Sequence, residues 1–364
     1  MKAISLFSGA GGLDVGFESA GFKIVWANDS NKHACATYTA NRDTLIKWGL
    51  LSDFFEDLDQ LPQVDVIFGG SPCQGFSVAG KMDPNDERSR LVFLFLEIVK
   101  KHQPKAFVME NVYSLGTLDK FSLVREALIE KATEAGYDTD LLVLNAADFG
   151  VPQNRKRMFL IGVKGTRING RIEEKIRHYE AVPPKMRELL IPLGKAGTVK
   201  NPITCKARIT IATKPVLRRS PYAGMLFNGS GRPLNPDSLS CTLPASMGGN
   251  KTPIIDENHV YDGAESWVEK YHKHLLEGGQ PLGKDDAPDF LRRLTIEECS
   301  RIQTFPDGYI FQGPTSAIYQ QIGNAVPCGL ATAVAKGLKE ILDNEDTENS
   351  CYTKQQQSLQ LSLL

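Results

Sequence analysis

Short apolar runs alternate with helix-like stretches over the first ~165 residues, and this order constrains the fold more than any other feature. Strands that alternate with helices form a mainly parallel sheet with helices on both faces. We therefore predict an α/β fold for this part of the chain. The predicted strands are Ala3–Phe7, Lys23–Ala27, Asp65–Phe68, Lys105–Met109, Leu141–Leu144 and Met158–Val163, and the clearest helices are Gly12–Ala20, Ser89–Lys101 and Phe121–Ala135.

The composition changes after about Gly165. Residues 165–290 are richer in Pro, Gly and basic residues, and their strand signals are short and broken, which predicts a second, smaller and irregular domain. Helical patterns return in Thr295–Phe305 and Pro327–Leu342, and we expect the last helix to pack back onto the first sheet. We assign residues 1–180 and 318–343 to one domain and 181–317 to the second. The polar, Gln/Ser-rich residues 344–364 are predicted to be a disordered tail.

The near-neutral net charge of −1 conceals a basic segment. Between Gln153 and Ser220 there are 17 lysines and arginines but only four glutamates. This asymmetry predicts a nucleic-acid-binding surface on an otherwise acidic body. A solvated basic face without a partner would have the same composition.

Cysteine usage and hydropathy limit the class of protein. Seven scattered cysteines without a C-x-x-C pair disfavour a disulfide framework and a metal site. No apolar run approaches the ~20 residues that cross a bilayer, and the N-terminus enters a strand pattern at once, which argues against a signal peptide. We therefore expect a cytoplasmic protein without a membrane partner, whose thiols stay reduced.

A lone cysteine, Cys73, lies in the octapeptide Gly70–Ser77, directly after the apolar run Val64–Phe68. A thiol at the mouth of a buried strand is placed for chemistry. The alternative is an ordinary buried cysteine, which is a common small hydrophobe in cores.

A glycine-rich turn follows the first strand at Phe7–Gly16. Glycines between a strand and a helix let the backbone approach a ligand and direct helix N–H groups toward it. The second strand ends at Asp29, about 20 residues after the first glycine, where an acid accepts hydrogen bonds from ribose hydroxyls. This pattern indicates an adenosine site at the carboxyl edge of the sheet, although a tight turn that serves only packing remains an alternative.

Two further polar groups belong to the same edge. Glu110 ends a strand, and parallel strands open onto one crevice, so Glu110 is expected to face the space around Cys73 as an acid beside a nucleophile. Gln153, Arg155 and Arg157 alternate in an extended segment and are expected to share a face. The guanidinium groups of Arg155 and Arg157 suit phosphates and base carbonyls. A surface glutamate and a charged edge strand are the alternatives.

These motifs, in this order, resemble those of the cytosine-C5 DNA methyltransferases, which use S-adenosyl-L-methionine. The matching stretches cover most of residues 1–165 and 291–327; they are Phe7–Gly12, Gly70–Gln74, Glu110–Val112, Gln153–Arg157, Arg292–Thr295 with Gln303–Pro306, and Gln321–Pro327. The resemblance implies a Rossmann-like S-adenosylmethionine-dependent methyltransferase sheet with a target-recognition domain. It also implies S-adenosyl-L-homocysteine as a product and no metal.

The resemblance also implies residue roles. Cys73 would add to C6 of a flipped cytosine, Glu110 would hold the N3/N4 edge of that base, and Arg155 and Arg157 would steady its O2. The residues implied around the cofactor are Phe7, Gly9, Ala10, Gly11, Asp29, Asp53, Phe54, Pro72, Asn324 and Val326. The chain departs from the family at Ser30, where relatives often carry an aromatic residue, and Asp29 is shorter than the usual Glu.

DNA contacts are expected from two loops. The segment from Gln74 to Ser89 would close over DNA, and the Gly-rich segment Ser240–Lys251 contains a Thr-Leu pair like that of the family's recognition regions. The implied DNA-binding residues are Gln74, Ser77, Thr242, Leu243, Ser246, Asn250 and Lys251.

We therefore predict a DNA (cytosine-5) methyltransferase that acts on double-stranded DNA as a monomer, as the modification enzyme of a restriction–modification system. A tRNA cytosine-5 methyltransferase of the same fold and a non-catalytic DNA-binding module are the alternatives. The basic insert favours DNA, and the intact Cys73, Glu110, Arg155 and Arg157 argue against a non-catalytic module. Finally, Gln360–Leu364 resembles the peptide that bacterial proteins dock into the sliding clamp, although a tail with chance leucines would look the same.

Overall fold

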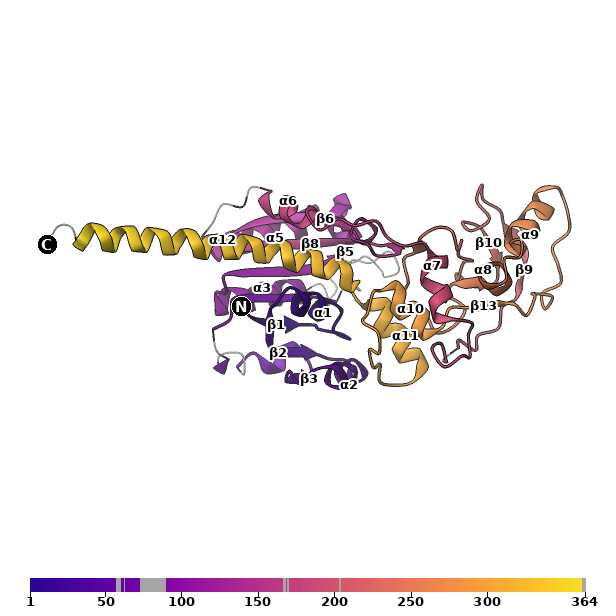
Figure 1. Cartoon of the computed structure of the whole chain (residues 1–364), viewed down its shortest axis with the longest axis horizontal. Coiled ribbons are helices and arrows are strands. Elements are labelled where there is room, and N and C mark those ends of the chain that lie inside the picture. Colours follow the sequence, from indigo (N-terminus) through magenta and orange to yellow (C-terminus); the bar gives the residue numbers. More distant parts are fainter. Residues whose placement is uncertain are drawn as a thin grey trace.

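The computed structural model describes residues 1–56, 60–61, 63–72, 90–165, 168, 170–202 and 204–361, with side chains up to residue 344. Its centre is a seven-stranded sheet in the order β3-β2-β1-β4-β5-β8-β6 (Figure 1). The neighbours pair in parallel except for β8, which is antiparallel to both β5 and β6. The strands are β1 (Lys2–Leu6), β2 (Lys23–Asp29), β3 (Ile46–Trp48), β4 (Val66–Gly70), β5 (Ala106–Val112), β6 (Tyr137–Asn145) and β8 (Lys156–Lys164).

Helices cover both faces of this sheet because alternate strand residues are apolar on either side. On one face, residues such as Ala3 and Val108 share a core with α1 (Gly12–Ser19), α6 (Arg171–Arg177) and α12 (Cys328–Leu361). On the other, residues such as Ile4 and Phe107 pack against α3 (Leu91–His102) and α5 (Ser122–Glu134). The predicted α/β fold with helices on both faces is confirmed.

The six strands predicted for this sheet are all present, with ends that differ by a few residues. Two short strands in this part of the chain were not predicted. The edge strand β3 has only three residues, and β7 (Gln153–Asn154) has two, so neither gives a clear period in the sequence. Helices α2 (Lys32–Asn41) and α4 (Tyr113–Thr117) follow β2 and β5.

A second region, residues 186–324, is built from short pieces around its own core and lies at one end of the molecule (Figure 1). Residues 318–324 were assigned to the sheet domain, but Ile318, Tyr319 and Ile322 pack into the core of the second region. The packing favours a boundary after α11. The elements of the region are α7 (Met186–Leu190), β9 (Ile211–Val216), β10 (Met225–Phe227), β11 (Ser240–Cys241), β12 (Ile254–Asp256), α8 (Glu257–Tyr261), α9 (Trp267–Leu276), β13 (Leu291–Arg293), α10 (Ile296–Ile302) and α11 (Thr315–Asn324).

The last helix runs into the residues that the sequence predicts to be a disordered tail. The backbone of α12 continues through Leu361 and projects beyond the sheet (Figure 1). No Gly or Pro occurs between Leu338 and Leu361, and Glu, Lys, Gln and Leu are good helix formers, so nothing in the sequence stops the helix. Of the suggested clamp peptide, residues 362–364 lie outside the described residues. No helix in the described part of the chain is both long and apolar enough to span a bilayer.

Candidate active site

A buried ion pair lies at the carboxyl end of β4 and β5. Arg157 Nε is 2.9 Å from Glu110 Oε1, and Glu110 is only 8% exposed. Burial raises the pKa of the Glu110 carboxyl, while the positive charges of Arg157 and Arg155 lower it in part. A carboxyl with a raised pKa can hold a proton closer to neutral pH than an exposed one, which suits an acid that donates to a ligand.

The start of the Cys73 segment is fixed against this carboxyl. Gly70 pairs in register with Glu110, and a Cβ at Gly70 would lie 2.8 Å from Glu110 Oε2, so the carboxyl occupies the space that a side chain would fill. Asn111 Nδ2 donates to Ser71 Oγ at 3.0 Å and contacts the Ser71 carbonyl. The adjacent pair Glu110–Asn111 therefore positions both residues that begin this segment. Cys73 itself, with Gln74 and Ser77, lies outside the described residues.

The glycine-rich turn after β1 forms the second part of the site. Phe7, Gly9 and Gly11 have left-handed φ angles of 53°, 56° and 83°. Gly9 N–H donates to Asp29 Oδ2 at 2.8 Å, and no atom lies within 4 Å of a Cβ built on Gly9. Burial raises the pKa of the Asp29 carboxyl, whose backbone donors from Gly9 and Asn31 lower it in part. The turn is thus open on one side and anchored to the acid that ends β2.

A buried polar network binds the backbone carbonyls of this turn, and the sequence analysis did not predict it. Tyr38 donates to Asp14 Oδ1 at 2.9 Å, and Asp14 is fully buried in α1. Arg42 Nη2 donates to the Gly11 carbonyl at 3.2 Å, and Tyr309 donates to the Ala10 carbonyl at 2.5 Å. Burial raises the pKa of Asp14, and the positive charge of Arg42 lowers it in part. Arg42 and Tyr309 are 267 residues apart, so no local pattern could link them.

The other residues predicted around the cofactor differ in exposure. Asp53 and Asn324 are exposed, while Pro72 is half-buried at the end of β4. Phe54 is partly buried, with its ring centroid 6.4 Å from that of Trp26. Ala10 and Val326 have side chains packed in hydrophobic cores. For these two, the backbone is therefore the part available to a ligand.

Arg155 has different hydrogen-bond partners from Arg157. Arg155 is 1% exposed, and its guanidinium donates to the carbonyls of Leu243 (2.9 Å), Gly323 (2.8 Å) and Ala325 (3.0 Å). The alternation that would align it with Arg157 is interrupted, because β7 ends at Asn154 and β8 begins at Lys156. Arg157 thus contacts Glu110, whereas Arg155 binds backbone from the second region and from the turn after α11.

The predicted DNA-reading segment of the second region is partly exposed. Leu243, one of the predicted DNA-binding residues, has its side chain fully buried in the core of that region. Thr242 is exposed, and its hydroxyl donates to the Asn154 carbonyl at 2.7 Å. Ser246, Asn250 and Lys251 are exposed.

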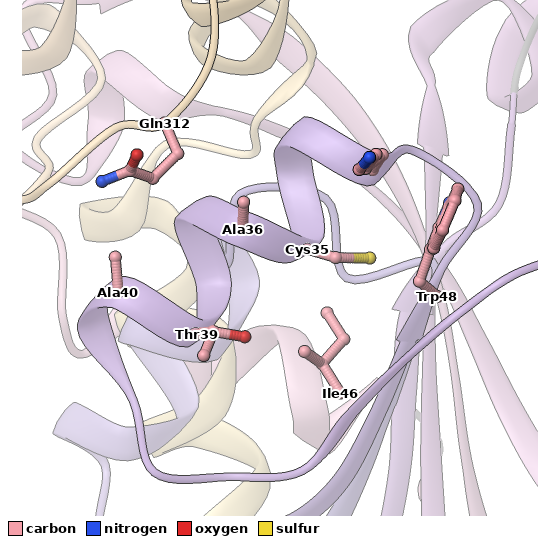
Figure 2. Close-up of a pocket in the computed structure, with 8 residues that line it drawn as sticks. Cys35, Ala36, Thr39, Ala40, Ile46, Trp48 and Gln312 are labelled. Carbon is pink, nitrogen blue, oxygen red and sulfur yellow. The ribbon is translucent and has the colours of Figure 1, made fainter.

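A surface cavity of about 580 Å³ lies between α2 and β3. Figure 2 shows Cys35 and Thr39 pointing from α2 toward Ile46 and Trp48. None of the predicted cofactor residues lines this cavity. It adjoins the predicted site through Cys35, whose thiol contacts the Asp29 carbonyl at 3.3 Å and whose burial raises its pKa to about 12. Among the described residues, no group of three or more His, Cys, Asp or Glu could hold a metal ion.

Comparisons with known proteins agree with these motifs. The family model for C-5 cytosine-specific DNA methylases matches residues 1–340. The type II methyltransferase M.FnuDI of Fusobacterium nucleatum is 34% identical over 357 residues, which cover 95% of this chain and 96% of that protein. M.NgoPII of Neisseria gonorrhoeae is also a type II methyltransferase. It is 33% identical over 368 residues, which cover 94% of this chain and 96% of that protein.

A solved structure shares the fold. The methyltransferase EhMeth of Entamoeba histolytica superposes with a TM-score of 0.67 at 18% identity, over 94% of this chain and 98% of that one. The family match spans the sheet, the second region and the start of α12. The chain therefore belongs to the C-5 cytosine-specific DNA methylase family and is a DNA cytosine-5 methyltransferase, as its motifs predicted.

Proposed function

We propose that this enzyme methylates C5 of a cytosine that it flips out of duplex DNA, with Cys73 as the nucleophile. The observation that carries the proposal is the buried Glu110–Arg157 pair, whose carboxyl lies against Gly70, three residues before Cys73. A thiol and a carboxyl with a raised pKa would then flank one small pocket. A base within a stacked duplex cannot reach such a pocket, so it must leave the helix.

In the proposed reaction, the Cys73 thiolate forms a bond to C6 while Glu110 donates a proton to N3. The electron pair of the C5–C6 double bond shifts toward C5, which becomes nucleophilic like an enamine carbon. After C5 has gained a methyl group, a base removes the C5 proton, and the C6–S bond breaks with its electron pair leaving on sulfur. The N3 proton returns to Glu110, which restores the neutral aromatic ring. Arg157 holds Glu110 in place and presents its cationic group toward the same pocket.

The described residues fit S-adenosyl-L-methionine, which supplies an electrophilic methyl group when bound. The open space at Gly9 lets a ligand approach the backbone, and Asp29 at the end of β2 has acceptor capacity for ribose hydroxyls. Asp53 is exposed and lies next to Phe54. We propose that these residues hold the adenosine, with Phe7 and Pro72 beside the methionine end.

We propose double-stranded DNA as the substrate and a restriction–modification system as the setting. The relatives M.FnuDI and M.NgoPII are both type II methyltransferases, which supports this proposal. Exposed basic residues of the second region, including Lys206, Arg208 and Lys214, suit phosphate contacts.

The test is to incubate the enzyme with labelled S-adenosyl-L-methionine and parallel DNA and tRNA substrates. We expect label in DNA, and bisulfite sequencing of an expressing host should then locate one methylated sequence. The Cys73→Ser variant should bind S-adenosyl-L-methionine but transfer no label. Label in tRNA alone would overturn the assignment of DNA as the substrate. Equal labelling by Cys73→Ser would overturn the assignment of Cys73 as the nucleophile.

A further inference from the structure

Three buried polar side chains meet where the sheet joins the second region. Gln153, Arg155 and Gln303 are 0%, 1% and 0% exposed. Gln153 Nε2 donates to Gln303 Oε1 at 2.8 Å, and Gln303 Nε2 donates to the Ile322 carbonyl at 2.6 Å and the Ala325 carbonyl at 3.1 Å. We call these three side chains the junction cluster.

The junction cluster forms hydrogen bonds with both the N–H and the carbonyl of Leu243, a residue of the second region. Leu243 N–H donates to Gln153 Oε1 at 2.8 Å, and the Leu243 carbonyl accepts from Arg155 Nη1 at 2.9 Å. The preceding residues, Ser240–Cys241, form β11 and pair in parallel with β7. Leu243 therefore has a fixed position relative to β7, and it cannot slide or turn without leaving buried polar groups unpaired.

The same cluster holds the turn between α11 and α12. Arg155 Nη2 donates to the carbonyls of Gly323 and Ala325, and Gln303 binds the Ala325 carbonyl as well. A Cβ on Gly323 would lie 2.4 Å from the Pro244 carbonyl, so this turn and the 243–245 segment are in direct contact. Residues 153–155, 243–245 and 322–325 are far apart in the sequence, and the side chains of Gln153, Arg155 and Gln303 hold them together.

The junction cluster lies between the proposed base pocket and the segment proposed to face DNA, and this position indicates its function. Two residues after Arg155, Arg157 pairs with Glu110 in the proposed base pocket. On the other side of Leu243, Thr242 and Ser246 are exposed in the segment proposed to face DNA. The junction cluster connects these two sites, and buried hydrogen-bonded networks of this kind are rigid.

We infer that Gln153, Arg155 and Gln303 are positioning residues that hold the DNA-facing segment at a fixed distance from the Glu110–Arg157 pocket. This assigns Arg155 to backbone support instead of contact with the cytosine. The inference rests on the proposed function, because it concerns how a recognised base is delivered to that pocket. Misalignment by about 1 Å can cost 10²-fold in rate.

A double-mutant cycle tests the inference on the full-length enzyme with unmethylated genomic DNA. Arg155→Lys keeps the charge but not the geometry, and Gln303→Met keeps the volume but not the hydrogen bonds. We expect each to lower kcat by roughly 10-fold or more, while KM for DNA and Kd for S-adenosyl-L-methionine change by less than about 3-fold. The double variant should be no slower than the slower single variant, because both break one unit.

Arg187→Met is the matched control. Arg187 also donates to two backbone carbonyls, those of His259 and Val260, but all of its partners lie within the second region. We expect its kcat to stay within about 2-fold of the wild type and its effect to be independent of Arg155→Lys. The number of S-adenosyl-L-methionine molecules bound per protein chain measures the folded fraction of each variant, and each kcat is divided by that fraction. Should Gln303→Met not fold, Gln153→Met breaks the same chain of bonds from its other end.

Two results would overturn the inference alone. If Arg155→Lys lowers kcat but Gln303→Met does not, Arg155 acts on the base directly. If the effects of the two substitutions multiply, the residues do not act as one unit. Failure of the wild type to methylate any DNA would instead overturn the proposed function, and the inference with it.

Discussion

At the scale of single residues, the Glu110 carboxyl is the group whose protonation decides the proposed chemistry. Burial raises its pKa, and Arg157 and Arg155 partly offset that effect. If the protonated form donates to N3, the methylation rate must fall as pH rises through this raised pKa. The Cys73 thiol needs to lose its proton and works in the opposite direction, so the rate should be bell-shaped in pH.

Glu110→Gln removes the group whose titration sets the alkaline limb of the pH–rate profile. We expect the single-turnover rate to fall by about 10²–10⁴-fold and its alkaline limb to disappear between pH 5 and 10. Arg157→Gln should move that limb to higher pH, because the carboxylate loses the cation that stabilises it. An alkaline limb that persists unchanged in Glu110→Gln would show that another group is the acid.

At the scale of elements, the glycine-rich turn ends at Gly12, which lies against the backbone just before α12. A Cβ on Gly12 would lie 2.5 Å from the Val326 carbonyl, a backbone atom that cannot rotate away. We expect Gly12→Ala to lower the free energy of unfolding by about 1–3 kcal/mol in urea titrations. Gly249→Ala is the control, since nothing lies within 4 Å of its Cβ, and it should change stability by less than ~0.5 kcal/mol. Equal losses would refute the close approach.

The long helix α12 divides into a packed half and a projecting half. Leu338, Ile341 and Leu342 are buried in the sheet domain, whereas the later turns extend past the body (Figure 1). Deleting residues 345–364 should change the free energy of unfolding by less than ~0.5 kcal/mol and leave methylation unchanged. Leu338→Ala should cost about 2–5 kcal/mol. Thermal unfolding of both variants measures the difference, and a large loss on deletion would contradict this division.

At the scale of the whole molecule, the sheet was predictable because its strands are apolar and periodic. The placement of Asp29 and Glu110 at the carboxyl ends of β2 and β5 followed from the parallel arrangement. The position of Arg155 did not, because its strand is interrupted where β11, almost 90 residues later, pairs with β7. The buried Leu243 and the support of the glycine turn by Tyr309 were missed for the same reason, since long-range contacts leave no local period.

The central claim is that Cys73 forms a covalent bond to C6 of the target cytosine. DNA synthesised with 5-fluorodeoxycytidine tests it directly, because after methyl transfer the C5 fluorine cannot leave as a proton does, and the adduct persists. In the presence of S-adenosyl-L-methionine, the wild type should form a complex with this DNA that survives denaturing electrophoresis, with peptide mass analysis placing the bond at Cys73. Cys73→Ser should form none. A wild type that methylates ordinary DNA but leaves no such complex, or a bond at another residue, would contradict the account.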